Sequence, residues 1–297
     1  MTAVLENEAV AAPAAGRRRT WLPFGYLSAP MAVLILLVFV PTVILFLISL
    51  GMKVGRGQSA WSLDAYASIL TDPLYHKVAL TTVVIATCAM VVQLVIGVPL
   101  AYVMAFKSGR FEVPLLLGLV LLDQLNPVIR VYAWRMLLGR NGIINGFLQA
   151  IGVIDQPIDW LLFNEVTVVI VLSTSWITYT VIPLYAAMKA IDTSLFQAAA
   201  DLGAGWWTMT RRILLPLAAP GIFMAVLLVY IPLFTDFATP TLVGGTSGYM
   251  LGQAVNDLIL VQGDLARGAA LSNLLLLASG VVAAIAFRLA KINKLES

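Results

Sequence analysis

Long uninterrupted apolar runs dominate the chain. A run of about 18 or more apolar residues without a charge is long enough to cross a bilayer as a helix. Five stretches contain no Asp, Glu, Lys or Arg and reach that length, namely 27–52, 78–106, 166–188, 213–235 and 268–287. We therefore predict five transmembrane helices from these stretches alone.

A sixth span is predicted over 113–138, where good apolar flanks surround Asp123, Arg130 and Arg135. Ionisable groups inside a span cost roughly 2.5–3.5 kcal/mol on insertion scales, so they normally face a cavity or a partner. We therefore count this stretch as a span that carries functional or paired charges, and we expect Arg135 to reach toward the outer headgroups.

Four polar or aromatic residues of the sixth span recur at steps of three or four, which places them on one helix face. They are Asp123, Asn126, Arg130 and Trp134. One interpretation is that this stripe lines a solute pathway. The alternative is that Asp123 and Arg130 neutralise each other or a neighbouring helix. Pro127 opposes a hydrogen bond to the Asp123 carbonyl and predicts a kink there.

Two further uncharged stretches are not counted as spans. Pro240 and four glycines break 237–256, which favours an outer loop or a re-entrant segment. The stretch 142–154 is too short to cross and predicts a short surface helix. Asp236 follows the fifth counted run directly. It either helps to receive a cation from outside or caps backbone groups of the adjoining loop.

Composition agrees with a membrane protein. Of the 297 residues, 61% are hydrophobic and 11% are charged, whereas soluble domains carry roughly 25% charged residues. Cys88 is the only cysteine and His76 the only histidine. An intrachain disulfide is therefore impossible, and no metal site is predicted because Cys and His ligands are lacking.

Basic residues are distributed unequally between the two sides of the six predicted spans. The segments on the side of the termini are 1–26, 107–112, 189–212 and 288–297, and they hold eleven Lys and Arg, against five in the opposite loops. The positive-inside rule then places both termini in the cytoplasm. We predict a disordered tail at 1–26, a six-helix domain at 27–290 with a cytoplasmic loop at 189–216, and a tail at 291–297. Binding of nucleic acid has no support.

The cytoplasmic loop 189–216 has a local pattern of its own. Ser194 and Gln197 have the spacing of a capping box, and Gly203 is a natural helix terminator. We expect a short helix, a glycine turn, and a second short helix from about Trp206 to Arg212. Such a loop could dock on another protein, although a loop that merely joins two spans is the alternative.

The same loop resembles the EAA loop, E-A-A-x3-G-x9-I-x-L-P, of ABC-importer permeases. Gln197-Ala198-Ala199, Gly203, Ile213, Leu215 and Pro216 stand at its spacing. The leading Glu of the motif is Gln197 here, which puts in doubt any charge contact that this Glu makes to the ATPase subunit. The resemblance implies that the loop is a coupling helix. The residues that it assigns to contact with the ATPase are Gln197, Ala198, Ala199, Asp201, Gly203 and Pro216.

Shorter stretches at 129–134, 139–142 and 242–245 resemble the spermidine/putrescine permease branch. The resemblance implies an all-α, six-helix type I ABC importer permease in a bacterial inner membrane. Its implied partners are a second homologous permease, two ATP-binding subunits and a periplasmic or lipid-anchored solute-binding protein. No Walker A pattern occurs, so ATP and Mg would be bound by the partner ATPase, and the chain itself is expected to be neither an enzyme nor a cofactor carrier.

The expected cargo is a polyamine or a related cationic compound. Iron(III), an opine or another small solute is the alternative within the same class. Two rivals belong to other classes. A self-sufficient secondary transporter would use the intramembrane charges to couple ions to solute, and a membrane-embedded enzyme would need a nucleophile or metal motif that we do not find.

Overall fold

The computed structural model describes residues 24–52 and 61–293, which form helices and turns without a strand. It consists of two compact units, Met1–Ile44 and Leu45–Ser297. Most of the expected tails, 1–23 and 294–297, lies outside the described residues. Their described parts, 24–26 and 291–293, continue the first and last helices.

Four helices of the described residues are long and apolar enough to cross a membrane by themselves. Three are α1 (Phe24–Ser49), α3 (Pro73–Phe106) and α13 (Leu265–Asn293). The fourth is a continuous helix made of α10 (Trp206–Met209), the π-helical turn η3 (Thr210–Leu214) and α11 (Leu215–Thr235). The stretches predicted at 78–106, 213–235 and 268–287 fall on these helices, and the stretch at 27–52 does so as far as Ser49, where α1 ends.

Two further spans are broken helices. A 48° bend separates α7 (Glu165–Ser175) from α8 (Ile177–Lys189). A 93° bend follows α4 (Glu112–Asp123), before α5 (Pro127–Leu138) and α6 (Ile143–Ala150). Six spans result if each bent pair counts as one, which agrees with the predicted number.

The expectation of a single kinked helix over 113–138 is wrong, because the stretch forms two separate helices. Pro127 cannot donate to the Asp123 carbonyl, and the chain leaves the helical path at Gln124–Asn126 instead of kinking within it. The side chain of Asn126 then accepts from the backbone N–H of Val128 at 2.9 Å and starts a new helix. Asp123 therefore ends one helix, while Arg130 and Trp134 lie on the next.

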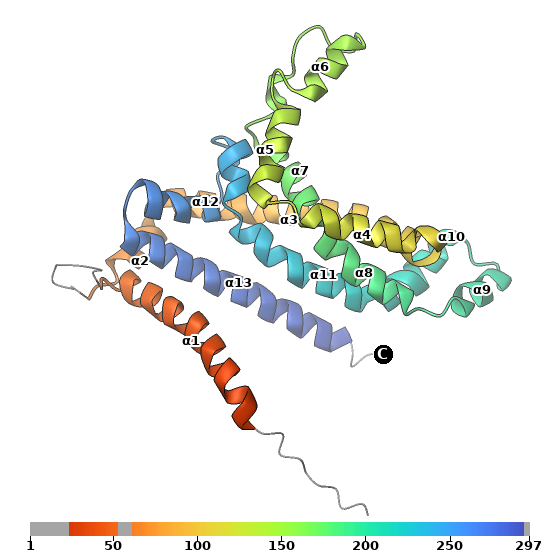
Figure 1. Ribbon diagram of the computed structural model, residues 1–297, viewed down its shortest axis with the longest axis horizontal. Helices are drawn as coiled ribbons and strands as arrows, with labels where there is room; N and C mark the ends of the chain where they lie inside the picture. Colours follow the sequence, from red (N-terminus) through yellow and green to blue (C-terminus); the bar gives the residue numbers. More distant parts are fainter. Residues whose placement is uncertain (1–23, 53–60, 294–297) are drawn as a thin grey trace, which may run out of the picture. The chain divides into compact units, whose positions relative to one another are not determined.

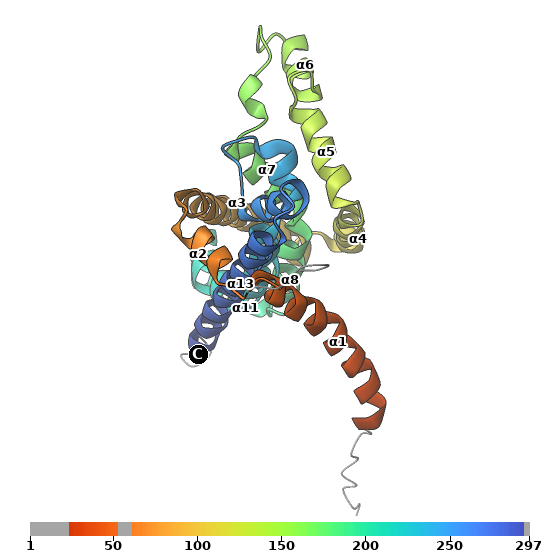
Figure 2. The same cartoon turned by 90° about the vertical axis from the view of Figure 1, so that its left-hand side faces the viewer.

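The α6 helix projects beyond the other helices of the second unit, while α5 packs beside α7 and η4 (Pro240–Gly244) (Figures 1 and 2). The buried amide of Asn145 holds this projecting part together. This amide donates to the carbonyls of Gly139 and Ile158 at 3.1 and 3.3 Å and accepts from the Ile158 N–H at 2.8 Å. A short helix predicted at 142–154 is therefore present as α6.

The stretch 237–256 is folded into the second unit and is not a plain loop. It contains η4 (Pro240–Gly244) and α12 (Leu251–Asn256), with η5 (Asp257–Val261) following. Val243, Met250 and Ala254 are buried. Gly252 permits this packing, because a Cβ atom there would lie 2.5 Å from the Asp236 carbonyl oxygen.

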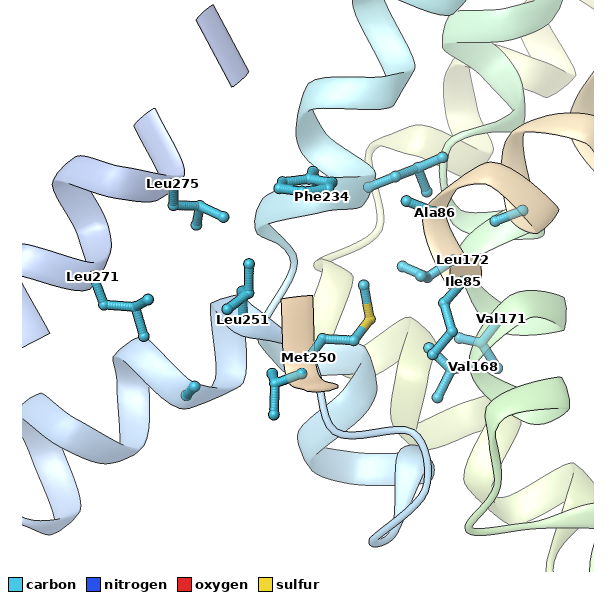
Figure 3. Close-up of a cluster of buried hydrophobic side chains, with 14 of the residues drawn as sticks. Ile85, Ala86, Val168, Val171, Leu172, Phe234, Met250, Leu251, Leu271 and Leu275 are labelled. Atoms are coloured by element: carbon cyan, nitrogen blue, oxygen red, sulfur yellow. The ribbon is translucent and has the colours of Figure 1, made fainter. Parts of the chain in front are cut away.

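The main hydrophobic cluster joins α3, α7, α11, α12 and α13 (Figure 3). Side chains at its centre include Ile85, Ala86, Val168, Val171, Leu172, Phe234, Met250, Leu251, Leu271 and Leu275. A second cluster lies nearer α9 and contains Met104, Leu184 and Ala218. Within it α8 and α11 approach closely, since a Cβ atom on Gly221 would lie 2.5 Å from the Ala187 Cβ atom and 2.7 Å from the Pro183 carbonyl oxygen.

Short helices complete the chain. They are α2 (Asp64–Thr71), η1 (Gly109–Phe111), η2 (Asp159–Leu161) and α9 (Ser194–Asp201). The α2 helix is fixed by a polar cluster in which the Tyr66 and Ser49 hydroxyls lie 2.7 Å apart. The Asn273 amide donates to these two hydroxyls at 3.0 and 3.1 Å. The polar cluster thus links the last turn of α1, α2 and α13.

Candidate functional site

The predicted coupling loop forms a helix, a glycine turn and a second helix. Its first helix, α9, begins differently from the prediction. The Asp192 carboxylate accepts from the Ser194 N–H at 2.9 Å, and the expected capping box of Ser194 and Gln197 is not formed. Asp is a favoured residue at the start of a helix because its short side chain can accept a hydrogen bond from the backbone N–H two residues on. The hydrogen bond from the Ser194 N–H lowers the pKa of Asp192.

Gly203 ends α9 as predicted. Its φ is +79°, a left-handed conformation that costs a residue with a Cβ atom. The Gly203 N–H donates to the Ala200 carbonyl and the Ala204 N–H to the Ala199 carbonyl, both at 2.9 Å. This pair of bonds is the Schellman arrangement, which satisfies carbonyls at the helix end.

The sequence predicts that the second helix of the loop ends near Arg212, but in the structure it does not end there. It continues through η3 into α11, with the Leu215 N–H bonded to the Thr210 carbonyl. Pro216 has no N–H for the Arg212 carbonyl, and a single π-helical turn absorbs that loss without ending the helix. Pro216 consequently lies within the long helix and not in the loop.

The loop exposes apolar side chains and is anchored by aromatic ones. No residue of α9 is buried, and Leu202, which follows it, is 88% exposed. Phe196 differs from the other α9 residues because its ring packs against another aromatic ring. Its centroid lies 5.4 Å from that of Phe106 in an edge-on arrangement, and the Phe106 centroid lies 5.3 Å from that of Tyr102 on α3. A pocket of about 240 Å³ lies beside this contact, between α3, α9 and the α10–η3 segment.

A polar contact fixes the helix that leads into the loop. Lys189, at the end of α8, lies 2.7 Å from the Glu112 carboxylate at the start of α4, and the Tyr185 hydroxyl donates to the same carboxylate. Sequence reasoning missed these residues and the aromatic anchor. In the sequence, these residues are marked only by their position at the ends of apolar runs.

The second candidate region surrounds the helix breaks. Arg130 reaches from α5 to the carbonyl of Ser175 at 2.5 Å, where α7 ends. It also donates to the carbonyls of Leu122, Asp123 and Leu125 at 3.2, 3.3 and 3.1 Å. A cation is favoured at helix C-termini, so Arg130 stabilises two breaks together.

Asp123 and Arg130 do lie close together, but their contact is loose. The Asp123 Oδ1 atom is 3.9 Å from the Arg130 Nη2 atom. Its Oδ2 atom accepts from the Tyr179 hydroxyl at 2.8 Å, and Tyr179 was not predicted as a site residue. Trp134 packs against the hydrophobic cluster instead of joining these polar groups.

Asp236 caps the chain where α11 ends. Its carboxylate accepts from the Thr239 N–H at 2.9 Å and the Thr239 hydroxyl at 3.2 Å. Burial raises the pKa of Asp236, and the hydrogen bonds from Thr239 offset part of that rise. The local-capping alternative therefore describes its contacts.

The model of the family "Binding-protein-dependent transport system inner membrane component" matches residues 23–293. The chain belongs to this family. It is a multi-pass inner-membrane permease subunit of an ABC importer, as the EAA-loop resemblance predicts, and such a subunit works with an ATPase and a solute-binding protein.

Relatives of this family member include the spermidine/putrescine transport system permease protein PotB. PotB of Salmonella typhimurium (strain SL1344) is 34% identical over 79% of this chain and 81% of its own length. PotB of Haemophilus influenzae is 31% identical over 80% and 84%. A bacterial alginate ABC transporter, solved with a periplasmic protein bound to an alginate pentasaccharide, has the same fold, with a TM-score of 0.76 at 16% identity over 93% of this chain and 96% of that one. The type I permease fold is confirmed.

Proposed function

We propose that this permease carries a polyamine, such as spermidine or putrescine, or a related cationic solute. The observation that supports this cargo is the identity of about one third with PotB over four fifths of both chains. Other relatives move different solutes: the molybdenum transport system permease protein ModB of Mycobacterium bovis is 31% identical over 61% of this chain. Iron(III), an opine or another small solute is therefore the alternative cargo.

The proposed assembly contains this subunit, a second homologous permease, two ATPase subunits and a periplasmic or lipid-anchored solute-binding protein. ATP and Mg are bound by the ATPase subunits and not by this chain. Both termini face the cytoplasm, because the basic residues concentrate on that side of the spans. No contact with nucleic acid is proposed.

Coupling is proposed to run through α9 and its glycine turn. Gln197, Ala198 and Asp201 are exposed and available to an ATPase surface, with Ala199 and Gly203 setting the shape of the turn. The aromatic contact of Phe196 then passes a displacement of α9 to α3. Moving such an equilibrium from 1:99 to 99:1 requires about 5.5 kcal/mol of differential binding, which closure of the ATPase subunits on ATP would supply.

The solute pathway is proposed to pass the helix breaks. Asp123, Asn126, Arg130, Trp134 and Asp236 are its candidate residues. Asn126, Arg130 and Asp236 make hydrogen bonds with main-chain groups at those breaks, so their proposed part is to shape the pathway. Asp123 is the residue proposed to meet the solute.

Reconstitution into proteoliposomes tests the proposed function. The complete complex, with ATP on the side of the ATPase and labelled spermidine opposite, is expected to accumulate spermidine only while ATP is hydrolysed. Uptake by this chain alone, without an ATPase, would instead establish the secondary-transporter rival. A complete complex that hydrolyses ATP but ignores polyamines would contradict the proposed cargo.

A further inference from the structure

The bend between α7 and α8 presents two neighbouring aromatic side chains, of which Tyr179 contacts an intramembrane carboxylate and Trp176 packs against the hydrophobic cluster. Trp176 lies at the bend itself and Tyr179 in the first turn of α8, with ring centroids 5.6 Å apart. The Tyr179 hydroxyl donates to the Asp123 carboxylate. Neither aromatic residue was singled out by the sequence.

This group of side chains is held in place from three sides. The Gln93 amide, fully buried on α3, donates to the Leu172 carbonyl at 3.2 Å and accepts from the Thr180 hydroxyl at 2.5 Å, so it joins both sides of the bend. The Thr178 hydroxyl donates to the Leu119 carbonyl of α4 at 3.0 Å. Arg130 binds the Ser175 carbonyl.

The Asp123 carboxylate retains an open hydrogen-bonding position. Its Oδ1 atom makes no hydrogen bond within the described residues, and the Arg130 Nη2 atom stays 3.9 Å away. Arg130 instead directs both Nη atoms at four main-chain carbonyls, which stabilise its charge. The side chain of Asp123 keeps 21% of its surface exposed, and Tyr179 keeps 38%.

We propose that Asp123 and Tyr179 form a binding site for one ammonium group of the transported solute. The Oδ1 atom, which accepts no hydrogen bond from the described residues and lies 3.9 Å from Arg130 Nη2, would accept an N–H from the ammonium. The ring of Tyr179 would flank the charge of the ammonium, an arrangement that favours organic cations. Gln93 and Arg130 are positioning residues of this site. The proposal deepens the proposed function and rests on its cationic cargo.

The test uses the complete reconstituted complex, with labelled putrescine, spermidine, lysine and choline as probes and a neutral sugar for comparison. Asp123→Asn keeps the shape and the Tyr179 contact but removes the charge. We expect it to raise the transport KM for the ammonium probe about tenfold or more, with ATP hydrolysis stimulated by the binding protein unchanged. Tyr179→Phe, which removes only the hydroxyl, is expected to raise KM by a smaller factor.

Asp155→Asn is the matched control, because Asp155 is an exposed carboxylate in the segment after α6. An equal KM in Asp123→Asn, Tyr179→Phe and Asp155→Asn, with normal transport by the unmodified complex, would overturn the site and leave the proposed function standing. Transport of choline or lysine but not of polyamines, with KM raised by Asp123→Asn, would support the site and contradict the polyamine cargo. A complex that moves only the neutral sugar overturns both.

Discussion

Several polar side chains of the bundle use their hydrogen bonds on main-chain groups at helix ends. Asn126 and Asp236 accept backbone N–H groups where helices begin, and Arg130 donates to carbonyls where helices stop. In a bilayer an unsatisfied backbone group has no water to bind, so each break needs such a residue. Polar residues in a span therefore mark breaks as often as they mark solute contacts.

At Gly203 the requirement concerns the backbone conformation and not a side-chain hydrogen bond. Its φ is +79°, and an added Cβ atom would meet nothing within 4 Å. We expect Gly203→Ala to weaken the turn by about 1–2 kcal/mol through conformation alone and to lower the number of solutes carried per ATP hydrolysed. Gly203→Asn should lose less, because Asn tolerates the left-handed region.

Gly146→Ala is the control for this prediction. Gly146 also has open space around it, but its φ is not positive and it lies inside α6. Uptake and ATP hydrolysis, measured in the same vesicles, give the number of solutes carried per ATP hydrolysed. An unchanged ratio in Gly203→Ala would mean that the turn does not transmit the work of the ATPase.

At the scale of elements, helices break where the sequence shows an uninterrupted apolar run. The stretch 166–188 contains no charge, yet it bends by 48° between Ser175 and Ile177. A side chain from another helix, Gln93, completes the hydrogen bonds on both sides of that bend. The bend therefore depends on a contact between α3 and the α7–α8 pair.

Replacing Gln93 with Met tests this dependence. Met fills a similar volume, but the Leu172 carbonyl and the Thr180 hydroxyl lose their partner in a buried place, where each unsatisfied group costs about 1–3 kcal/mol. We expect a lower thermal unfolding temperature of the detergent-solubilised complex and a raised transport KM. Gln156→Met, at an exposed position, should change neither, and equal behaviour of the two variants would refute the role of Gln93.

The sequence predicted the spans and the helix–turn–helix shape of 189–216, apart from its N-terminal cap and the end of its second helix, because these features depend on local patterns. Apolar runs fix where helices cross, and Gly203 fixes where α9 ends. The course of 113–138 was mispredicted because Pro127 allows either a kink or a complete break. Asn126 favours the break by capping the next helix locally, and Arg130 does so through its contact with Ser175 across the fold. Tyr179 and Trp176 lay inside an ordinary apolar run, where only the bend reveals them.

At the scale of the whole molecule, the orientation in the membrane is open to a direct test. Cys88 is the only cysteine, so Cys88→Ala gives a background without thiols. In that background Asp155→Cys is expected to react with a membrane-impermeant maleimide added outside the cell, and Asp201→Cys only after the membrane is opened. The reverse pattern would place the termini outside.

The close approach at Gly221 has a mechanical consequence. The helices α8 and α11 flank the coupling loop in sequence, and their backbones meet where any larger residue would collide with the Pro183 carbonyl and with Ala187. Such close packing hinders sliding of one helix along the other, so both ends of the loop are attached to a pair of helices that is expected to move together. A displacement of α9 would then move α8 and α11 together, and would not be taken up by a change in the length of the loop.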